Sequence, residues 1–416
     1  MKRVGYWLSE KKSRRFNFEE LTTYCRESHL DLVKIDLDRP LEDQGPFDVL
    51  FHKLTDVISS ATQGDSKSQQ WIAAVRNYVK AHPEVRILDP IDNVRQLLDR
   101  HTQYDVISKC SAIADEVHVF MPTFVEFTTN DVETNKRLLK KHNVTYPFLC
   151  KPAVANGSLS HQMSIIFNEE GLQDVNPPCV AHTFVNHNAV LYKVFIIGDQ
   201  HFMVQRPSVK NLRPGDQQTI YFDSHHVSKP DSTSFLNELD EVDKLSPVIQ
   251  PSATELFLLA HGIQADLGLN LFGIDIIVEN NTGRYALIDI NAFPSYEGVS
   301  GFYRSLAYLL QQAAWSPTWP PKSCHPAVYW PSDLAASQEK SPTLSSKYGH
   351  SVDNGFGTNG LLRLHACNGC EEKSPQELNG FIQSCVSMQG IVAKTEEEKS
   401  HNHNLFFPSG NLHVPR

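Results

Sequence analysis

The sequence predicts an α/β protein in which a small parallel sheet is followed by strand-rich α+β lobes. Three observations predict this fold class. Strands and helices alternate over about the first 110 residues, residues 146–198 are rich in strands, and residues 272–298 have the pattern of a long β-hairpin. With 416 residues, the chain is long enough for two or three domains, or for one large core with a tail.

The alternation at the start predicts a Rossmann-like parallel sheet. A polar loop is expected at residues 9–15, strands at 2–8, 32–37, 47–53 and 86–89, and helices from about 17, 68, 92 and 102. Ligands of such sheets bind beyond the carboxyl ends of the strands, where Lys12 and Lys53 fall. Their position alone leaves each of them either a binding residue or an ordinary surface lysine.

Two further lysines lie in the strand-rich segment. Lys151 ends an apolar strand before a small flexible loop, which suits a phosphate clamp, although Asn156-Gly157-Ser158 is also an everyday hairpin connection. Lys193 interrupts the apolar strand at 189–198. A lysine among apolar neighbours is costly unless it is paired with an anion, or unless its stem lies on apolar surface at a sheet edge.

The hairpin carries acids that face each other. Two strands rich in Ile and Val flank the turn at residues 280–283, so a turn centred near Thr282 places Asp275 opposite Asp289, with Cβ atoms roughly 5 Å apart. Asn291 is the next residue on that face. Two carboxylates and an amide oxygen suit Mg²⁺, and the alternative is a solvated face or a different register. The opposite face is expected to be apolar, with Ile274, Ile276 and Val278 beside Ala286, Ile288 and Ile290.

Composition excludes several classes of function. A net charge of −10 argues against a general binder of nucleic acid or of anionic membranes, because a polyphosphate surface needs a broad basic face. The eight cysteines are scattered, which suits reduced thiols, and neither a signal peptide nor a membrane-spanning run is recognisable. We therefore expect a cytoplasmic protein without membrane insertion, and a monomer by default.

After Pro317 the composition shifts to Pro, Ser, Gly, Asn and His, which predicts a disordered tail. Helices are expected before and after the hairpin, at about 252–267 and 301–314. Within the tail, His365, Cys367 and Cys370 resemble half of a zinc site that lacks a second cysteine pair.

Seven motifs occur in the order typical of one family. They are GYWLSEKK, HKLTD, LLDR, HNAVLYKV, QRPS, FGIDII and IDINAFP. Together they resemble the inositol 1,3,4-trisphosphate 5/6-kinases, also called inositol-tetrakisphosphate 1-kinases, which have the ATP-grasp fold. The resemblance covers roughly residues 2–314. It implies a Rossmann-like pre-ATP-grasp domain at 1–110, a central ATP-grasp lobe at 111–200 and a second lobe with the hairpin at 201–316. The tail expected at 317–416 lies outside the resemblance.

The resemblance also implies an ATP site, a Mg²⁺ site and an inositol polyphosphate site. The implied metal ligands are Asp275, Asp289 and Asn291. Nucleotide contacts are implied for Arg100, Lys151, Ser208, Ser224, Ser228 and the stretch from His182 to Lys193. Substrate contacts are implied for Lys12, Lys53, His161, Lys193, Asn291 and Ser295. Lys193, Asp289 and His161 are the expected catalytic residues, and no residue is identified as a general base.

Two residues depart from the family pattern. Ser295 stands where the family usually has glycine, so it narrows the pocket or alters which isomer fits. His182 stands where glutamine is common at the start of the stretch beside the adenine, which puts that side-chain contact in doubt.

Two rival functions stay open at this point. An ATP-dependent carboxylate-amine ligase would use the same acids but pass through an acyl phosphate, and the basic residues on the acceptor side favour a polyanionic substrate instead. A non-catalytic nucleotide-binding scaffold is the other rival, and the acids, the amide and the lysines argue against it.

Overall fold

The computed structural model describes residues 1–317 apart from 111, 113–117, 158 and 246. The chain divides into two units, Met1–Leu334 and Ala335–Arg416, and the described residues all belong to the first. The expected tail from residue 318 on, with His365, Cys367 and Cys370, lies outside them. The four cysteines within the described part are free and buried, and no helix there is long and apolar enough to cross a membrane.

A parallel sheet in the order β2-β1-β3-β4 opens the chain, as the alternation predicts. Its strands are β1 (Lys2–Leu8), β2 (Leu30–Lys34), β3 (Val49–Lys53) and β4 (Arg86–Leu88). The helices of this part are α1 (Glu10–Ser13), α2 (Phe18–Glu27), α3 (Thr55–Thr62), α4 (Ser66–Ala81), α5 (Ile91–Arg95) and α6 (Arg100–Ser108).

Two helix assignments differ from the expectation. The residues expected as a loop form α1, because the hydroxyl of Ser9 accepts a hydrogen bond from the Lys12 backbone at 3.4 Å and caps the first turn. The helix expected over 92–100 ends at Arg95, and Asp99 caps α6 by accepting from Thr102 N at 2.7 Å. Arg100 is therefore the first residue of a new helix.

A second, antiparallel sheet has the order β12-β8-β7-β9-β6. Its strands are β6 (Phe124–Phe127), β7 (Phe148–Pro152), β8 (Gln162–Ile166), β9 (Cys179–Thr183) and β12 (Ile220–Asp223). Helix α7 (Val132–Lys141) packs on one face through Leu139, and α8 (Ser224–Ser228) follows β12 directly. The opposite face carries Lys151 and His182.

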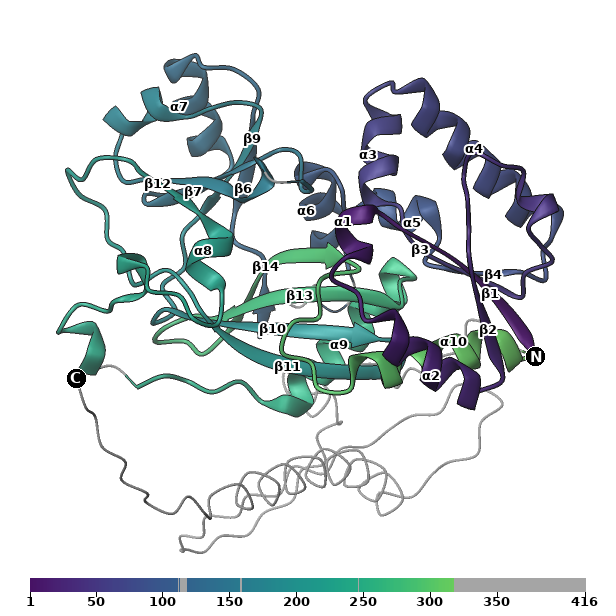
Figure 1. The fold of residues 1–416 in the computed structure, drawn as a ribbon. Helices are drawn as coiled ribbons and strands as arrows, with labels where there is room; N and C mark the ends of the chain where they lie inside the picture. The colour runs from purple at the N-terminus through teal and green to yellow at the C-terminus, as the bar shows by residue number, and fades with distance from the viewer. Residues whose placement is uncertain (111, 113–117, 158, 246, 318–416) are drawn as a thin grey trace, which may run out of the picture. The chain divides into compact units, whose positions relative to one another are not determined.

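The third sheet has the order β11-β10-β13-β14-β5 and contains the hairpin (Figure 1). Its strands are β5 (Val119–Phe120), β10 (Val190–Ile197), β11 (Gln200–Pro207), β13 (Leu271–Val278) and β14 (Tyr285–Ala292). Helices α9 (Ala253–Leu267) and α10 (Phe302–Trp315) belong to the two large apolar cores. Strands β5 and β10, from the lobe expected at 111–200, pair with strands from the lobe expected at 201–316. The expected boundaries of the two lobes stay a prediction.

The register of the hairpin confirms part of the expectation and corrects the rest. Asp275 pairs with Asp289, as predicted, but a bulge follows, so that Ile276 pairs with Leu287. The extra residue is Ile288. Between it and the turn, each β14 side chain therefore lies on the face opposite to the one expected from a regular pairing. Leu287 joins Ile274 and Ile276 in the main core, whereas Ala286 and Ile288 lie with Ile277 in a separate apolar cluster. Placing Ala286 and Ile288 on the core face was therefore wrong.

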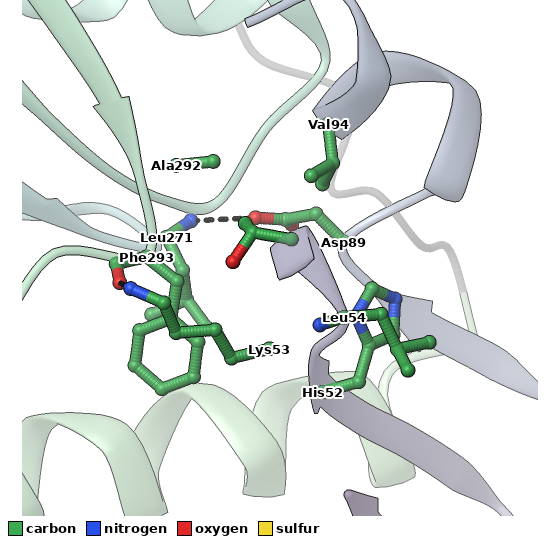
Figure 2. A pocket seen from close by; sticks show the side chains of 9 residues that line it. His52, Lys53, Leu54, Asp89, Val94, Leu271, Ala292 and Phe293 are labelled. Carbon is green, nitrogen blue, oxygen red and sulfur yellow. Dashed lines mark hydrogen bonds between the residues drawn. The ribbon is translucent and has the colours of Figure 1, made fainter. Parts of the chain in front are cut away.

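A buried carboxylate joins the first sheet to the third. Asp89, which follows β4, accepts hydrogen bonds from the backbone N and side-chain Nδ2 of Asn270 at 2.8 and 3.0 Å. It also accepts a hydrogen bond from Leu271 N at 2.9 Å, which Figure 2 shows. Only 4% of its surface is exposed. Burial raises its pKa to about 6, although all three hydrogen bonds oppose that change.

We expect Asp89→Ala to lower the free energy of unfolding by about 2–4 kcal/mol, because it leaves buried N–H groups without acceptors. Asp92→Ala is the control, since the ion pair of Asp92 with Arg76 is largely exposed and is worth at most about 1 kcal/mol. Chemical unfolding of both variants measures the difference. Equal losses in the two variants would contradict a special role for Asp89.

Candidate active site

Three charged side chains form a row across three neighbouring strands. Lys193 on β10 pairs in register with Asp275 on β13, which pairs in register with Asp289 on β14 (Figure 1). The Nζ atom of Lys193 lies 2.8 and 2.6 Å from the two oxygens of Asp275. Lys193 is therefore paired with an anion. Its strand is not at the edge of the sheet, because β11 pairs with the other side of β10.

Asp289 has its own cation, which comes from α6. Arg100 Nη1 lies 3.0 Å from Asp289 Oδ1, and Arg100 Nε donates to the carbonyl oxygen of Pro152 at 3.1 Å. The Arg100 side chain is only 3% exposed. The second oxygen of Asp289 accepts from the Asn291 amide at 3.4 Å, so the three predicted metal ligands lie together.

A fifth charged side chain, Lys151, approaches from the second sheet. Lys151 Nζ donates to the Tyr104 hydroxyl at 2.9 Å and to the carbonyl oxygen of Ile288 at 2.8 Å. Tyr104 Oη in turn donates to the same carbonyl at 2.8 Å. The predicted phosphate lysine is thus fixed against the bulge of β14.

Burial and charge oppose each other in this cluster. Burial raises the pKa of Asp275, and Lys193 only partly offsets it. Burial also acts to raise the pKa of Asp289, but Arg100, Lys151 and Lys193 together outweigh it and leave that pKa below its ordinary value. Burial lowers the pKa of Lys151 to about 7. The cluster is therefore a set of partly desolvated charges that depend on one another.

Lys12 and Lys53 form a second group beyond β14. Lys53 Nζ donates to the carbonyl oxygen of Phe293 at 2.6 Å, and Lys12 Nζ donates to that of Pro294 at 3.0 Å (Figure 2 shows Lys53 and Phe293). Both ammonium groups lie over the Phe293 ring, 5.8 and 4.7 Å from its centroid. Their bonded partners here are neutral, in contrast with those of Lys193 and Arg100.

The turn after β14 presents Ser295 to solvent. Phe293 and Tyr296, on either side of Pro294 and Ser295, have φ values of 41° and 55°, which non-glycine residues seldom adopt. Arg206 Nη2 donates to the carbonyl oxygen of Glu297 at 2.7 Å. Cationic side chains from α1, β3 and β11 therefore hold this turn through its carbonyl groups.

The predicted histidine and serine contacts lie in two further places. His161 Nδ1 is 3.4 Å from the hydroxyl of Ser224, the first residue of α8, and Ser228 ends that helix. Burial lowers the pKa of His161, and Asp223 is the strongest opposing charge. Ser208 is buried, and its hydroxyl lies 2.7 Å from His187 Nε2.

His182 lies on the same face of the second sheet as Lys151. Its Nδ1 is 3.1 Å from the carbonyl oxygen of Thr183, and its Nε2 is buried without a hydrogen-bond partner in the described part of the chain. Burial holds the pKa of His182 well below its ordinary value. Beyond it, Val185, Leu191, Ile277 and Ala286 form an apolar cluster, which Phe120 and Ile288 join. The neutral His182 ring offers Nε2 as a hydrogen-bond acceptor, and this acceptor together with the apolar cluster suits a planar nucleotide base.

The structure adds residues that the sequence analysis did not select. Tyr104 braces Lys151, Phe293 lies under two lysines, and Arg206 holds the turn at Glu297. Arg206 stands within a quoted motif, which was the only signal available for it. Tyr104 lies in a helix with no local feature that marks it.

Two pockets in the described part of the chain differ in how they relate to the predicted residues. A space of about 10 Å³, room for about one water, lies beside Lys53, Asp89 and Phe293 (Figure 2). An open pocket of about 540 Å³ lies elsewhere, lined by α6, β6 and α7, and none of the predicted site residues lines it.

Two family models match most of the described chain. The inositol 1,3,4-trisphosphate 5/6-kinase pre-ATP-grasp domain matches residues 3–94, and the ATP-grasp domain of the same kinases matches residues 113–312. The ATP-grasp fold expected from the motifs is thereby confirmed.

Curated relatives agree with this match. Inositol-tetrakisphosphate 1-kinase of Xenopus laevis is 45% identical over 307 residues, covering 73% of this chain and 77% of that protein. The Danio rerio protein of the same name is 46% identical over 307 residues, with the same two coverages. Inositol-tetrakisphosphate 1-kinase 3 of Oryza sativa subsp. indica is 33% identical over 304 residues, covering 72% of this chain and 79% of that protein. The chain therefore belongs to the inositol 1,3,4-trisphosphate 5/6-kinase family.

Proposed function

We propose that the protein is a Mg²⁺-dependent kinase that transfers the γ-phosphate of ATP to a hydroxyl group of an inositol polyphosphate. Family membership supports the class of reaction. The observation that carries the assignment of the site is the row of Lys193, Asp275 and Asp289, together with Arg100 and Lys151. This cluster brings together, on one face of the third sheet, acids that could bind a metal and cations that could bind phosphates.

The donor set fits the metal. Asp275, Asp289 and Asn291 offer hard oxygen ligands on adjacent strands, which suit Mg²⁺. When bound there, Mg²⁺ would supply neutralisation of the charge on the nucleotide phosphates. Arg100 and Lys151 would bind phosphate oxygens, and the apolar cluster beside His182 would hold the base.

Lys12 and Lys53, whose bonded partners are neutral carbonyl groups, are the residues we assign to binding the inositol polyphosphate. Lys12 and Lys53 would bind phosphates already on the ring and turn the reacting hydroxyl toward the ATP, with Ser295 at the edge of their turn. His161 would contribute from the second sheet. Phosphoryl transfer requires little covalent work from the protein beyond such positioning and neutralisation of charge.

The direct test is incubation with Mg-ATP and a panel of inositol tris- and tetrakisphosphates, followed by separation of products on an anion-exchange column. The proposal requires a product with one more phosphate and one ADP for each phosphate transferred. Release of ADP with free phosphate, and no phosphorylated product, would contradict it.

Asp289→Asn is expected to lower kcat by about 100-fold or more, because it removes a charged metal ligand worth several kcal/mol in the transition state. Glu279→Gln is the matched control on the same hairpin, since Glu279 pairs with Arg284 near the turn, away from the row. Circular dichroism confirms that both variants are folded. Near-normal turnover of the folded Asp289→Asn variant would remove Asp289 from the metal site.

The Michaelis constant for the inositol phosphate is expected to rise above pH 7. Burial, with help from Lys53 and Arg15, lowers the pKa of Lys12 to about 7, so its ammonium is present below that pH and is lost above it. One lost charge predicts a rise of up to about tenfold for each pH unit.

Lys12→Arg separates this effect from ionisation of the substrate. A guanidinium keeps its charge, so the profile of this variant should be flatter than that of the wild type between pH 7 and 9. Steady-state kinetics at saturating ATP provides both profiles. Parallel profiles would rule out Lys12 as the titrating group.

A further inference from the structure

The two acids of the row differ in how fully their cations occupy them. A single ammonium group, that of Lys193, bonds both oxygens of Asp275, at 2.8 and 2.6 Å. Asp289 gives only Oδ1 to Arg100, and its Oδ2 has the weak 3.4 Å contact with Asn291. Asp289 is therefore open on one oxygen, whereas Asp275 is occupied on both.

A metal at Asp275 would compete with the lysine for the same carboxylate. Each oxygen keeps a second lone pair, but a divalent cation shared by Asp275 and Asp289 would repel an ammonium group bonded to that carboxylate. This repulsion would weaken the bond between Lys193 and Asp275. An ammonium group that loses its partner there would be partly desolvated and unpaired, which is costly.

The two cations also differ in their freedom to move. Arg100 is 3% exposed and is held by Pro152 as well as by Asp289. Lys193 is 23% exposed, and within the described residues its ammonium group hydrogen-bonds only with Asp275. A flexible lysine stem can take the ammonium to another anion nearby, whereas Arg100 is a fixed neighbour.

A nucleotide phosphate is the anion that can take over the lysine. This step rests on the proposed function, which places the phosphates above the row. We propose that Lys193 is an exchangeable counterion, which keeps a divalent cation off Asp275 until a nucleotide phosphate accepts its ammonium group. Metal and nucleotide then bind cooperatively, because each relieves the cost of the other, and the coupling is reciprocal.

The test uses Mn²⁺ as a paramagnetic probe at pH 8, with free Mn²⁺ measured by electron paramagnetic resonance. Without nucleotide, Lys193→Met is expected to bind Mn²⁺ at least about fivefold more tightly than the wild type, because nothing occupies Asp275. With the β,γ-imido analogue of ATP in the presence of Mn²⁺, the same variant is expected to bind the nucleotide more weakly, because a phosphate loses its ammonium partner. A lysine with only a structural role would not produce opposite changes.

Two controls make the result decisive. Lys210→Met removes an ion pair with Asp240 that is separate from the row, with Nζ and Oδ1 2.8 Å apart, and should leave both affinities unchanged. Because Lys193→Met leaves Asp275 unpaired, the thermal midpoint of each protein is also measured with and without Mn²⁺. The increase caused by Mn²⁺ should be larger in Lys193→Met than in the wild type.

Asp289→Asn distinguishes failure of this inference from failure of the metal site. If this substitution abolishes Mn²⁺ binding while Lys193→Met leaves it unchanged or weaker, the metal site stands and the counterion exchange is overturned. If Asp289→Asn leaves Mn²⁺ binding intact, the metal assignment itself is wrong, and the exchange is overturned with it.

Discussion

The repulsion between Asp275 and Asp289 is the constraint on which the rest of the site depends. The two carboxylates oppose each other on adjacent strands, and both lie within the protein, so neither water nor distance screens them fully. Cations must supply the compensation. These cations are Lys193 on β10, Arg100 on α6 and Lys151 on β7. The charges of the two acids are therefore balanced only when these three elements, which are far apart in the sequence, have packed together.

Hydrogen bonds from neighbouring residues hold the charged cluster in position. Asp89 fixes the start of β13 to the end of β4, and Tyr104 fixes Lys151 to the bulge on β14. Each brace is a buried polar group whose hydrogen bonds offset part of the cost of burying it, so that cost grows if the partner is lost. A site in which charges act on phosphates needs such fixed positions, because preorganised charge is more effective than charge that must first be oriented.

Local pattern in the sequence accounts for the hairpin but not for its partners. A turn centred near Thr282 predicted that Asp275 lies opposite Asp289, and it does, but Val278 pairs with Tyr285, so the bulge supplies the residue that brings the two acids into register. The cost of an unpaired lysine in a strand anticipated that Lys193 is paired. The bulge at Ile288 has no local signal, because the residues around it are equally compatible with a regular strand. That is why the faces of Ala286 and Ile288 were assigned wrongly.

Contacts across the chain were equally out of reach of local pattern. Arg100 and Asp289 are 189 positions apart, and Lys53 and Phe293 are 240 apart, so only a resemblance to known proteins could bring them to one site before the fold was seen. The Ser9 cap is a different case, since a serine before a charged helical turn is a readable start signal that was overlooked. Propensity and capping rules therefore predict elements here, and the site depends on how the elements dock.

The cations of the candidate site have two kinds of partner. Lys193 and Arg100 bond to carboxylates, so they belong to the part of the site where a metal and a nucleotide would bind. Lys12 and Lys53 bond to backbone carbonyls and lie over the face of Phe293, which are weak partners for two ammonium groups. Burial lowers the pKa of both lysines, and Lys53 further lowers the pKa of Lys12. Such cations gain most from a ligand with several negative charges close together. A ring that already carries phosphates satisfies them, whereas a neutral acceptor would leave the repulsion in place, so the arrangement itself favours polyphosphorylated acceptors.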